Sequence, residues 1–451
     1  MSLFTSLLNS AGALGVYDRA LSVVQNNVAN ASTPGFAKQR QTLEAMAFEP
    51  AMGYPGGIEA GAVVSYRDAY AERAVRRQNE FLGFSSQKAS DLEQIEPAFN
   101  IAGGAGVPES LSALFEAFSV LAVSPNNLAA RSRVLDRAAG AAASFHQTAA
   151  ALAAAGGAED QQIRSTAGRI NELAAQVRDI NIERRNNFRT AEAPGVDAKL
   201  HVILDELAGL ADFTAIEAED RTTTLLLGGQ IPLVMGVRQF EIQADFSSPE
   251  TRILNPEGKD ITGVVTRGSL AALLEVKNQL LPSYLADLNR LAETVADRVN
   301  SVLAGGLDLY GSPPANHLFS YDSTAGAAAT LAAAPLDPAE LAAAGADAPG
   351  GNANALLLGE LGTSKEIDGL TFVEYYGALA GRMGNDLARA REDGEIQAEL
   401  AEQARSLREA VSGVSLDEEA AYLIQFQRAY QAVARMVTVL DELTKTVIQM
   451  V

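Results

Sequence analysis

The feature that most constrains this chain is a seven-residue apolar repeat at each of its ends. Near the N-terminus the repeat forms two columns, one of Leu7, Leu14, Leu21 and Val28 and one that contains Tyr17 and Val24. A repeat held over about four heptads is typical of a helix that packs lengthwise against another helix. The segment 30–35 (NASTPG) ends this predicted helix, because Pro34 disfavours helix before it and Gly35 permits a turn.

The C-terminal end carries a matching pattern. Ser415 and Glu418 have the spacing of a capping box, and no Gly or Pro follows them. Beyond this start, large apolar side chains again fall on two heptad columns, Leu423, Tyr430 and Val437 on one and Phe426, Val433, Leu440 and Val447 on the other. We predict one long helix here, of roughly 50 Å at about 1.5 Å per residue.

The two terminal helices are the candidate assembly surface. Each apolar seam alone gains too little from burial to offset the entropy of ordering its helix, so both need a partner. They can pair with each other, and against neighbouring subunits they can form a bundle. The alternative is an ordinary helical core within one chain. The residues predicted to make assembly contacts are Leu7, Leu14, Leu21, Val24, Val28, Leu423, Phe426, Tyr430, Val433, Val437 and Leu440.

The distribution of charge supports a division between ends and body. The net charge is −21, which makes nucleic acid and anionic membranes poor partners. Residues 1–60 carry a net charge of −1 and residues 411–451 carry −2, so the body between them holds −18. Near-neutral ends suit packing, whereas an acidic body suits exposure to water. The chain has no cysteine, so its stability does not come from disulfides.

The body reads as mainly helical with one small β insertion. Helical patterns cover 67–100, 109–156, 159–189, 269–303 and 364–412, and an irregular stretch covers 308–352. Two short strands at 222–227 and 231–234 flank Gly228 and Gly229, an alternating strand follows at 240–244, and 255–258 (NPEG) is a turn. We therefore predict a mainly α fold with a β-rich insertion over 212–266.

The sequence offers no recognisable catalytic, cofactor or metal site. The three histidines are isolated, and His201 with Asp205 and Glu206 falls short of a zinc motif. The glycine loop at 102–108 follows no predicted strand and lacks the third glycine of a dinucleotide fingerprint. Carboxylates are plentiful, but no motif singles out a pair of them, so a glycosidase pair can be neither excluded nor located. No run of about 18 apolar residues suggests a membrane span.

Both ends resemble a known family. Residues 26–30 (NNVAN) followed by 33–36 (TPGF) are similar to the N-terminal signature of flagellar rod, hook and hook-associated axial proteins. Residues 412–419 and 427–432 (QRAYQA) are similar to the C-terminal signature of the same family. These motifs indicate the axial family, but they do not choose among its members.

The body resembles one branch of that family, hook-associated protein 1 (FlgK). The resemblance runs in order along nearly the whole chain. It rests on Arg67 to Tyr70, Leu114 to Phe118 with Pro125 and Arg131, Ile170 to Asn181, Gly268 to Leu274, Leu281 to Asn300, Gly305 to Leu309, Leu318-Phe319, and Thr371 to Tyr376.

The resemblance implies a structural role without catalysis. It implies export through the flagellar type III channel to the outside of the cell, which fits a start that lacks the charged region of a signal peptide. It implies self-association into a ring or layer on the hook, with hook protein below, a second hook-associated protein and flagellin above, and an export chaperone on the C-terminal helix. The expected domains are a terminal coiled-coil domain (1–60 and 411–451), a helical body (61–211 and 267–410) and a reduced outer domain (212–266).

Two other readings of the sequence remain open. A hook or distal-rod protein shares both terminal signatures, but its middle is mostly β-structured, whereas this body reads as helical. A secreted hydrolase carried on axial-protein ends is the alternative from another class. Such an insertion should be large and should hold a metal or acid pair, and the β insertion here is about 55 residues long with neither.

Overall fold

Helices dominate the structure, as predicted. The computed structural model describes residues 3–49, 54–99, 106–186 and 194–449. The chain forms two compact units. Unit 1 comprises 1–81, 171–240 and 397–451, and unit 2 comprises 82–170 and 241–396. The predicted mainly α fold class with a small β portion is confirmed, while the predicted three-domain division remains a prediction.

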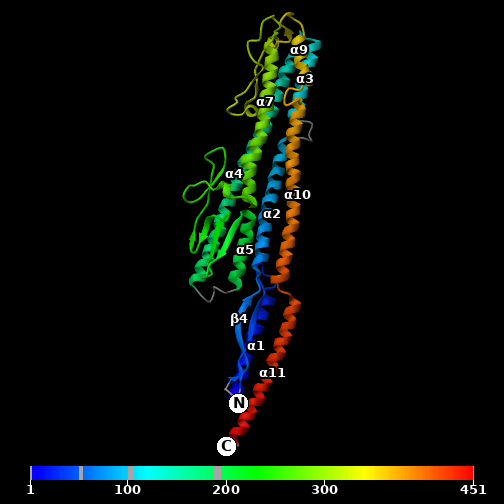
Figure 1. Ribbon diagram of the computed structural model, residues 1–451. Helices are drawn as coiled ribbons and strands as arrows, with labels where there is room; N and C mark the ends of the chain where they lie inside the picture. The colour runs from blue at the N-terminus through cyan, green and yellow to red at the C-terminus, as the bar shows by residue number, and fades with distance from the viewer. Residues whose placement is uncertain (1–2, 50–53, 100–105, 187–193, 450–451) are drawn as a thin grey trace. The chain divides into compact units, whose positions relative to one another are not determined.

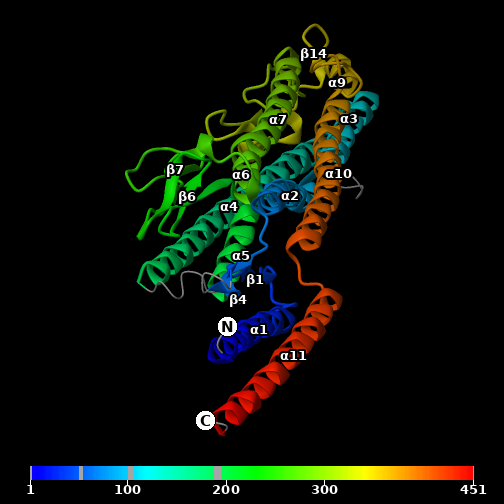
Figure 2. The ribbon, with the colours of Figure 1, turned by 60° about the horizontal axis from the view of Figure 1, so that its bottom comes forward.

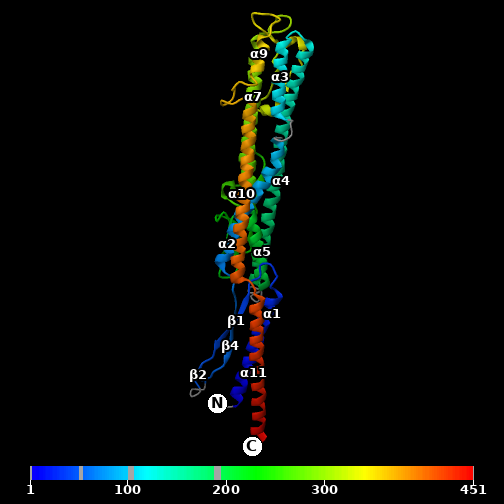
Figure 3. The same ribbon diagram turned by 90° about the vertical axis from the view of Figure 1, so that its right-hand side faces the viewer.

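In unit 1 the two terminal helices lie side by side. Helix α1 spans Leu3–Ala29 and helix α11 spans Leu416–Gln449 (Figures 1 and 3). A long antiparallel hairpin of β1 (Gln39–Ala45) and β4 (Ile58–Ser65) accompanies them, with a bulge between Gln41 and Leu43. Its far end carries the short pair β2 (Phe48–Glu49) and β3 (Tyr54–Pro55). The sequence pattern did not predict this hairpin.

The rest of unit 1 joins helices to a small sheet. Helix α5 (Pro194–Leu210) precedes four antiparallel strands in the order β5-β6-β7-β8, and the first part of α2 (Ala69–Ile95) also belongs here. The strands are β5 (Phe213–Glu217), β6 (Thr223–Leu227), β7 (Ile231–Met235) and β8 (Arg238–Gln239). The predicted pair around Gly228 and Gly229 is confirmed, and both glycines have positive φ, as a tight hairpin turn requires.

The sheet is fixed to the C-terminal part of α4 (Leu128–Asn186) (Figure 2). The Nδ2 of Asn181 donates to the carbonyls of Thr223 (2.8 Å) and Gly236 (2.7 Å), and its Oδ1 accepts from the amide of Thr223 (2.8 Å). One asparagine therefore pairs otherwise unmatched backbone groups of the sheet. The predicted strand at 240–244 forms only in part: β8 ends at Gln239, and the next strand, β9, begins at Gln243.

Unit 2 is a bundle of long helices. It contains α3 (Val107–Val123), most of α4, α6 (Gly268–Glu275), α7 (Leu281–Ala304), α9 (Ala353–Glu360) and much of α10 (Phe372–Ser412). Its core is rich in alanine and leucine, with a few aromatic contacts such as the edge-on pair of Phe99 and Tyr284 at 5.8 Å. A π-helical segment, Val276–Leu280, joins α6 to α7. Pro282 is the second residue of α7, and proline cannot donate a backbone hydrogen bond to the preceding turn.

The helix break predicted near residue 157 is wrong. Helix α4 continues through Gly156 and Gly157, and the break lies instead between α3 and α4, at 124–127. There the Oδ1 of Asn127 accepts from the amides of Ala129 (2.8 Å) and Ala130 (3.2 Å) and so caps α4. The predicted helix at 364–412 begins later, at Phe372. The glycine loop at 102–108 lies partly outside the described residues.

Short elements complete unit 2. The pair β9 (Gln243–Asp245) and β10 (Arg252–Leu254) precedes the predicted turn at 255–258, which is confirmed by the hydrogen bond from the Gly258 amide to the Asn255 carbonyl (2.9 Å). The stretch 308–352 is irregular, as predicted. It and its borders contain the short elements β11 (Gly306–Leu307), β12 (Phe319–Ser320), α8 (Ala327–Thr330), β13 (Ala332–Ala333), a 3-10 helix (Pro338–Glu340) and β14 (Ala344–Gly345).

Arg131 organises the irregular stretch. Its side chain is 1% exposed and donates to the carbonyls of Pro125 (2.7 Å) and Leu341 (2.6 Å). A buried guanidinium with carbonyl partners fixes loops that have no regular hydrogen bonds of their own. None of the helices that the structure describes has an apolar stretch long enough to cross a membrane.

Candidate assembly surface

The pairing of α1 with α11 rests on aromatic and apolar contacts. The rings of Tyr17 and Phe426 lie 6.4 Å apart, and Phe426 stacks in turn on Tyr422 at 6.1 Å. On α1 the most buried apolar side chains are Val16, Ala20 and Val24. Of these three, only Val24 belongs to the predicted columns.

The predicted assembly residues fall into three groups. Val24 is buried between the helices, at 2% exposure. Val28 and Tyr430 are 45% and 38% exposed. The others are partly buried: Leu7, Leu14, Leu21, Leu423, Phe426, Val433, Val437 and Leu440. Tyr17 and Phe426, one from a column of each helix, are in contact inside the chain, and the role of the columns in assembly stays a prediction.

Helix α11 has a second apolar face that the described residues leave open to solvent. Met436, Val439 and Leu443 are 56%, 54% and 48% exposed, and their spacing of three and four residues places them on one side of the helix. Val447 extends this face at 48% exposure. We call these four residues the outer face of α11. Contiguous exposed apolar faces are common at sites of interaction.

A buried polar cluster links the start of α11 to the end of α1. Glu419 is fully buried, and its Oε1 lies 2.9 Å from the Nη1 of Arg40. Asn27, also fully buried, donates to the Oε2 of Glu419 (3.2 Å) and to the carbonyl of Gln39 (2.8 Å). The guanidinium of Arg40 also stacks on the ring of Tyr422 at 3.9 Å. This cluster fixes the two terminal segments in one register.

The sequence analysis missed the structural role of these polar residues. The signal was present, because Asn27 lies in the NNVAN motif and Glu419 in the acidic first turn of α11. The sequence pattern pointed only to Glu418, as the partner of Ser415 in a capping box. The expected cap is present in part, since the amide of Glu418 donates to the Oγ of Ser415 at 3.4 Å, while its side chain lies 3.7 Å from Lys38.

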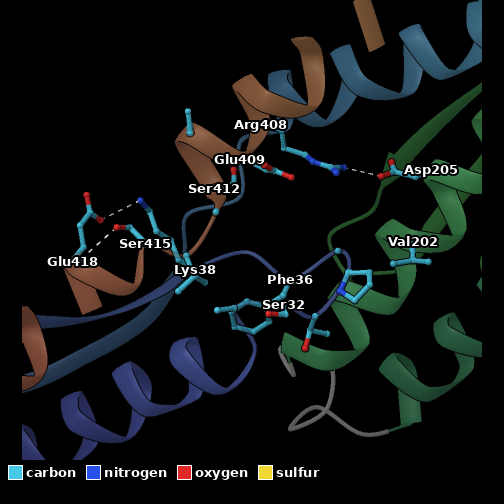
Figure 4. Close-up of a pocket in the computed structure, with 17 residues that line it drawn as sticks. Ser32, Phe36, Lys38, Val202, Asp205, Arg408, Glu409, Ser412, Ser415 and Glu418 are labelled. Atoms are coloured by element: carbon cyan, nitrogen blue, oxygen red, sulfur yellow. Dashed lines mark hydrogen bonds and ion pairs between the residues drawn. The ribbon is translucent and has the colours of Figure 1, made fainter. Parts of the chain in front are cut away.

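Two connecting segments of unit 1 border a cavity of about 720 Å³ (Figure 4). One segment is the TPGF turn, and the other is the break between α10 and α11 at Gly413. The amide of Lys38 donates to the carbonyl of Ser412 (2.9 Å), which joins the two segments. Figure 4 also shows Arg408 pointing toward Asp205 on α5, at 2.7 Å. Both chain connections to the terminal helices therefore meet at one place.

An ion-pair cluster lies beside these segments in unit 1. Glu72 of α2 is 2% exposed and contacts Arg67 (2.5 Å), Arg408 (3.4 Å) and His201 (3.5 Å). Burial alone would raise the pKa of Glu72. The hydrogen bond and charge of His201 and the charges of Arg67 and Arg408 outweigh burial and lower the pKa to about 2. The carboxylate is therefore ionised and held by cations.

The cluster accounts for the histidine that the sequence analysis considered as a metal ligand. The Nδ1 of His201 lies 3.0 Å from the Nη2 of Arg76. Asp205 forms an ion pair with Arg408. Within the described residues, no group of three or more His, Asp or Glu side chains is arranged to hold a metal ion. Arg67 also donates to the carbonyl of Gly35 (2.6 Å), so the cluster supports the TPGF turn.

Three regions of the chain match models of known protein families. Residues 7–36 match the family model of flagella basal body rod proteins, and residues 409–450 match that of the C-terminal region of flagellar basal body rod FlgEFG proteins. The chain is therefore an axial component of the bacterial flagellum. Residues 92–319, half of the chain, match the model of the helical domain of flagellar hook-associated protein FlgK. The chain belongs to the FlgK family of hook-associated proteins.

Similar proteins agree with this assignment. Flagellar hook-associated protein 1 of Bacillus subtilis (strain 168) is 27% identical over 499 residues, which cover 99% of this chain and 98% of that protein. The protein of the same name from Salmonella typhimurium is 25% identical over an alignment that spans 68% of this chain and 58% of that protein. The structure of the flagellar hook junction protein FlgK from Burkholderia pseudomallei aligns with a TM-score of 0.67. The alignment covers 75% of this chain and all of the Burkholderia pseudomallei chain, and the two sequences are 14% identical. This similarity therefore supports the fold alone.

Proposed function

We propose that this chain forms the junction between the hook and the filament, on the distal end of the hook, and that filament assembly requires it. It acts by packing of helices and carries out no catalysis. Membership of the FlgK family supports the proposal, as does the similarity along nearly the whole chain to flagellar hook-associated protein 1 of Bacillus subtilis. Hook and distal-rod proteins share the terminal signatures, but the matched helical domain at 92–319 favours a hook-associated protein.

The observation that carries the mechanism is the outer face of α11. Pairing with α1 covers one side of α11, yet Met436, Val439 and Leu443 stay about half exposed on another side. Burial of a side chain of this kind stabilises an assembly by roughly 1.5–3 kcal/mol. A helix that is apolar on two sides suits a bundle, so this face packs against the terminal helices of neighbouring copies.

The assembly that follows is a ring or helical layer of copies. The predicted residues Leu7, Leu14, Leu21, Val24, Val28, Leu423, Phe426, Tyr430, Val433, Val437 and Leu440 hold each terminal pair together or lie at its border with the next copy. Hook protein lies below this layer, and a second hook-associated protein and flagellin lie above it.

The same apolar face needs cover before assembly. An exposed apolar helix face in the cell invites aggregation, so an export chaperone binds α11 until the chain leaves through the flagellar export channel. The assembled protein lies outside the cell. The near-neutral ends and acidic body fit this arrangement, since the ends pack while the body faces water.

Electron microscopy of cells that lack the gene tests this function. We expect complete hooks without filaments, together with monomeric flagellin in the culture medium. Restoring the gene should restore filaments. Missing hooks would move the assignment to a rod or hook protein, and intact flagella would contradict a junction role altogether.

A further inference from the structure

Another cavity of unit 1, of about 620 Å³, is lined mainly by cationic side chains. Its walls come from the base of the β1–β4 hairpin, the first turns of α2, the end of α4, α5 and the strands β5 and β6. Among the described residues, five arginines and three carboxylates line it: Arg67, Arg73, Arg76, Arg184 and Arg221, and Glu72, Asp197 and Glu217. The whole chain has 56 acidic and 35 basic residues, so this cavity reverses the charge balance of the chain. We call it the arginine pocket.

Three of its arginines have carboxylate partners in the walls. Arg67 and Arg184 share Asp197, at 2.8 Å and 3.3 Å. Arg221 forms an ion pair with Glu217 at 3.4 Å. These contacts join α2, α4 and α5 and the loop before β6, so they have a structural explanation.

Arg76 is the buried arginine that these pairs leave without full compensation. Its side chain is 13% exposed, and its Nε lies 3.9 Å from Asp205, a carboxylate that already pairs with Arg408 at 2.7 Å. The Nη2 lies 3.0 Å from the Nδ1 of His201. In the described part of the chain, neither the buried Nε nor the Nη1 has a hydrogen-bond acceptor. Burial lowers the pKa of Arg76, because the charged form is poorly solvated there.

The charges around Arg76 do not balance. Three carboxylates serve four guanidinium groups there: Glu72, Asp197 and Asp205, with Arg67, Arg76, Arg184 and Arg408. A buried charge without a matching partner is costly, and a buried donor without an acceptor calls for an explanation. An anion in the cavity supplies both the missing charge and the missing acceptor. The planar fork of a guanidinium matches the oxygens of a phosphate or sulfate ion.

Arg73 provides a second cation at the opening of the pocket. It lies three residues before Arg76 on α2, so both are on one side of the helix. Its Nε donates to the carbonyl of Ala69 (3.1 Å), and its guanidinium lies 4.6 Å from the centre of the Tyr70 ring. Within the described residues, no carboxylate lies within ion-pair distance of Arg73. Its two terminal nitrogens are therefore available to a ligand.

We propose that the arginine pocket binds one small tetrahedral oxyanion, with Arg76 as the main ligand and Arg73 as the ligand at the opening. The proposal is independent of the proposed function, because it concerns unit 1 of a single chain. Glu72 and Asp197 stay paired with Arg67, so they oppose the anion less than free carboxylates would. The bound ion ties the first turns of α2 to α5 and to the base of the hairpin.

Isothermal titration of the purified full chain with sodium phosphate tests the site. At constant ionic strength we expect saturable binding of one phosphate per chain, with sulfate as a competitor. Arg76→Met should weaken binding about tenfold or more and Arg73→Met about threefold or more, since each removes a charged donor. Arg76→Lys keeps the charge but loses the fork, so its affinity should lie between those of the parent and Arg76→Met. Arg428→Met, at an exposed position of α11 outside the pocket, is the matched control and should bind like the parent.

The possible outcomes decide the proposal directly. Weak binding by both pocket variants and normal binding by Arg428→Met support the site. Binding like that of the parent in both pocket variants overturns it, as does a heat that sodium chloride reproduces at equal ionic strength. Circular dichroism melting shows which variants fold. If Arg76→Met does not fold, binding like that of the parent by Arg73→Met alone overturns the site. None of these results changes the junction role, which is measured by filament formation.

Hydrogen exchange gives an independent measurement. Saturating phosphate should slow exchange in the first turns of α2 and in α5, because a ligand that binds only the folded state opposes local opening. Exchange in α7 of unit 2 should stay the same. Equal slowing in the parent and in Arg76→Met would show that phosphate acts elsewhere on the chain and would overturn the site.

Discussion

Asn27 donates a hydrogen bond to Glu419 across 392 residues of sequence, at 3.2 Å between Nδ2 and Oε2. Both side chains are fully buried, and both belong to the terminal segments that carry the axial signatures. The signature residues thus bind the two ends of one chain to each other. Because Glu419 also pairs with Arg40, the cluster sets the register of α1, the β1–β4 hairpin and α11 together.

Removal of Glu419 should loosen the terminal pair without unfolding the bundle of unit 2. Glu419→Ala removes the carboxylate that Asn27 and Arg40 share in the buried cluster, and such a loss costs about 1–3 kcal/mol. Hydrogen exchange measured by mass spectrometry should therefore accelerate in α1 and α11. Glu418→Ala is the control, because that side chain is 56% exposed. Equal exchange in the Glu418 and Glu419 variants would contradict a role for the buried cluster.

Two substitutions on α11 should separate pairing within a chain from assembly between chains. Leu423→Asp places a charge on the side that packs against α1, so it should leave the body folded, loosen the terminal pair and abolish incorporation into flagella. Val439→Asp alters only the outer face, so pairing should persist while incorporation is lost. Swimming assays and hydrogen exchange of α1 measure the two effects.

Thr438→Asp is the matched control for the second substitution. Thr438 adjoins Val439 in sequence but lies on the polar side of α11, and it is exposed. Normal motility is expected for this variant. If Val439→Asp and Thr438→Asp behave alike, the outer face of α11 is not an assembly surface.

Apolar periodicity predicted the helices well, because it reports directly on which side of a helix is buried. It predicted α1, α11 and most of the body, and it located the hairpin around Gly228 and Gly229. It could not place the break between α3 and α4, since this depends on the cap that Asn127 provides rather than on a glycine pair inside a continuous helix.

Contacts between segments distant in sequence were beyond the reach of periodicity. The β1–β4 hairpin has an exposed, irregular pattern with a bulge, so its strands show no clean alternation. The pairing of Asn27 with Glu419 depends on two ends meeting in space, which a single sequence does not reveal. The heptad columns did not include Val16 and Ala20, which are buried on α1, and periodicity alone cannot tell a contact within one chain from a contact between chains.

Two buried carboxyl groups of unit 2 make its stability dependent on pH. Asp91 of α2 is fully buried, and Glu159 of α4 is 3% exposed. Burial raises the pKa of Asp91 to about 6, despite a hydrogen bond from Gln87 (2.6 Å). Burial, and then the charge of Asp91, raise the pKa of Glu159 to about 8. The nearest cation, Lys277, pairs with Asp160 at 2.8 Å.

Stability should therefore fall as pH rises. In the unfolded chain both carboxyls titrate at about pH 4. Their folded pKa values are higher, so the folded state binds more protons, and this stabilising contribution is complete below pH 4 and lost as pH rises to about 8. The melting temperature of unit 2 should decline between pH 5 and 8.5. Glu159→Gln should flatten this decline, and Glu257→Gln should not, since Glu257 is exposed.

Gly35 of the TPGF signature should not tolerate a side chain. Its φ is +72°, and a Cβ built on it would lie 2.5 Å from the carbonyl oxygen of Ala198 on α5. Gly35→Ala should therefore destabilise unit 1 by about 1–3 kcal/mol, because the turn must adopt a strained backbone and also move away from α5. Hydrogen exchange should rise first in the loop 30–38 and in α5.

Gly12→Ala is the opposite case and serves as the control. Gly12 lies inside α1, and a Cβ there would meet nothing within 4 Å. The substitution should stabilise α1 by up to about 1 kcal/mol, the difference between the helix propensities of alanine and glycine. If both alanine variants slowed exchange in their own segments, the Gly35 turn would not depend on its left-handed backbone or on close approach to α5. The TPGF signature would then need a different physical explanation.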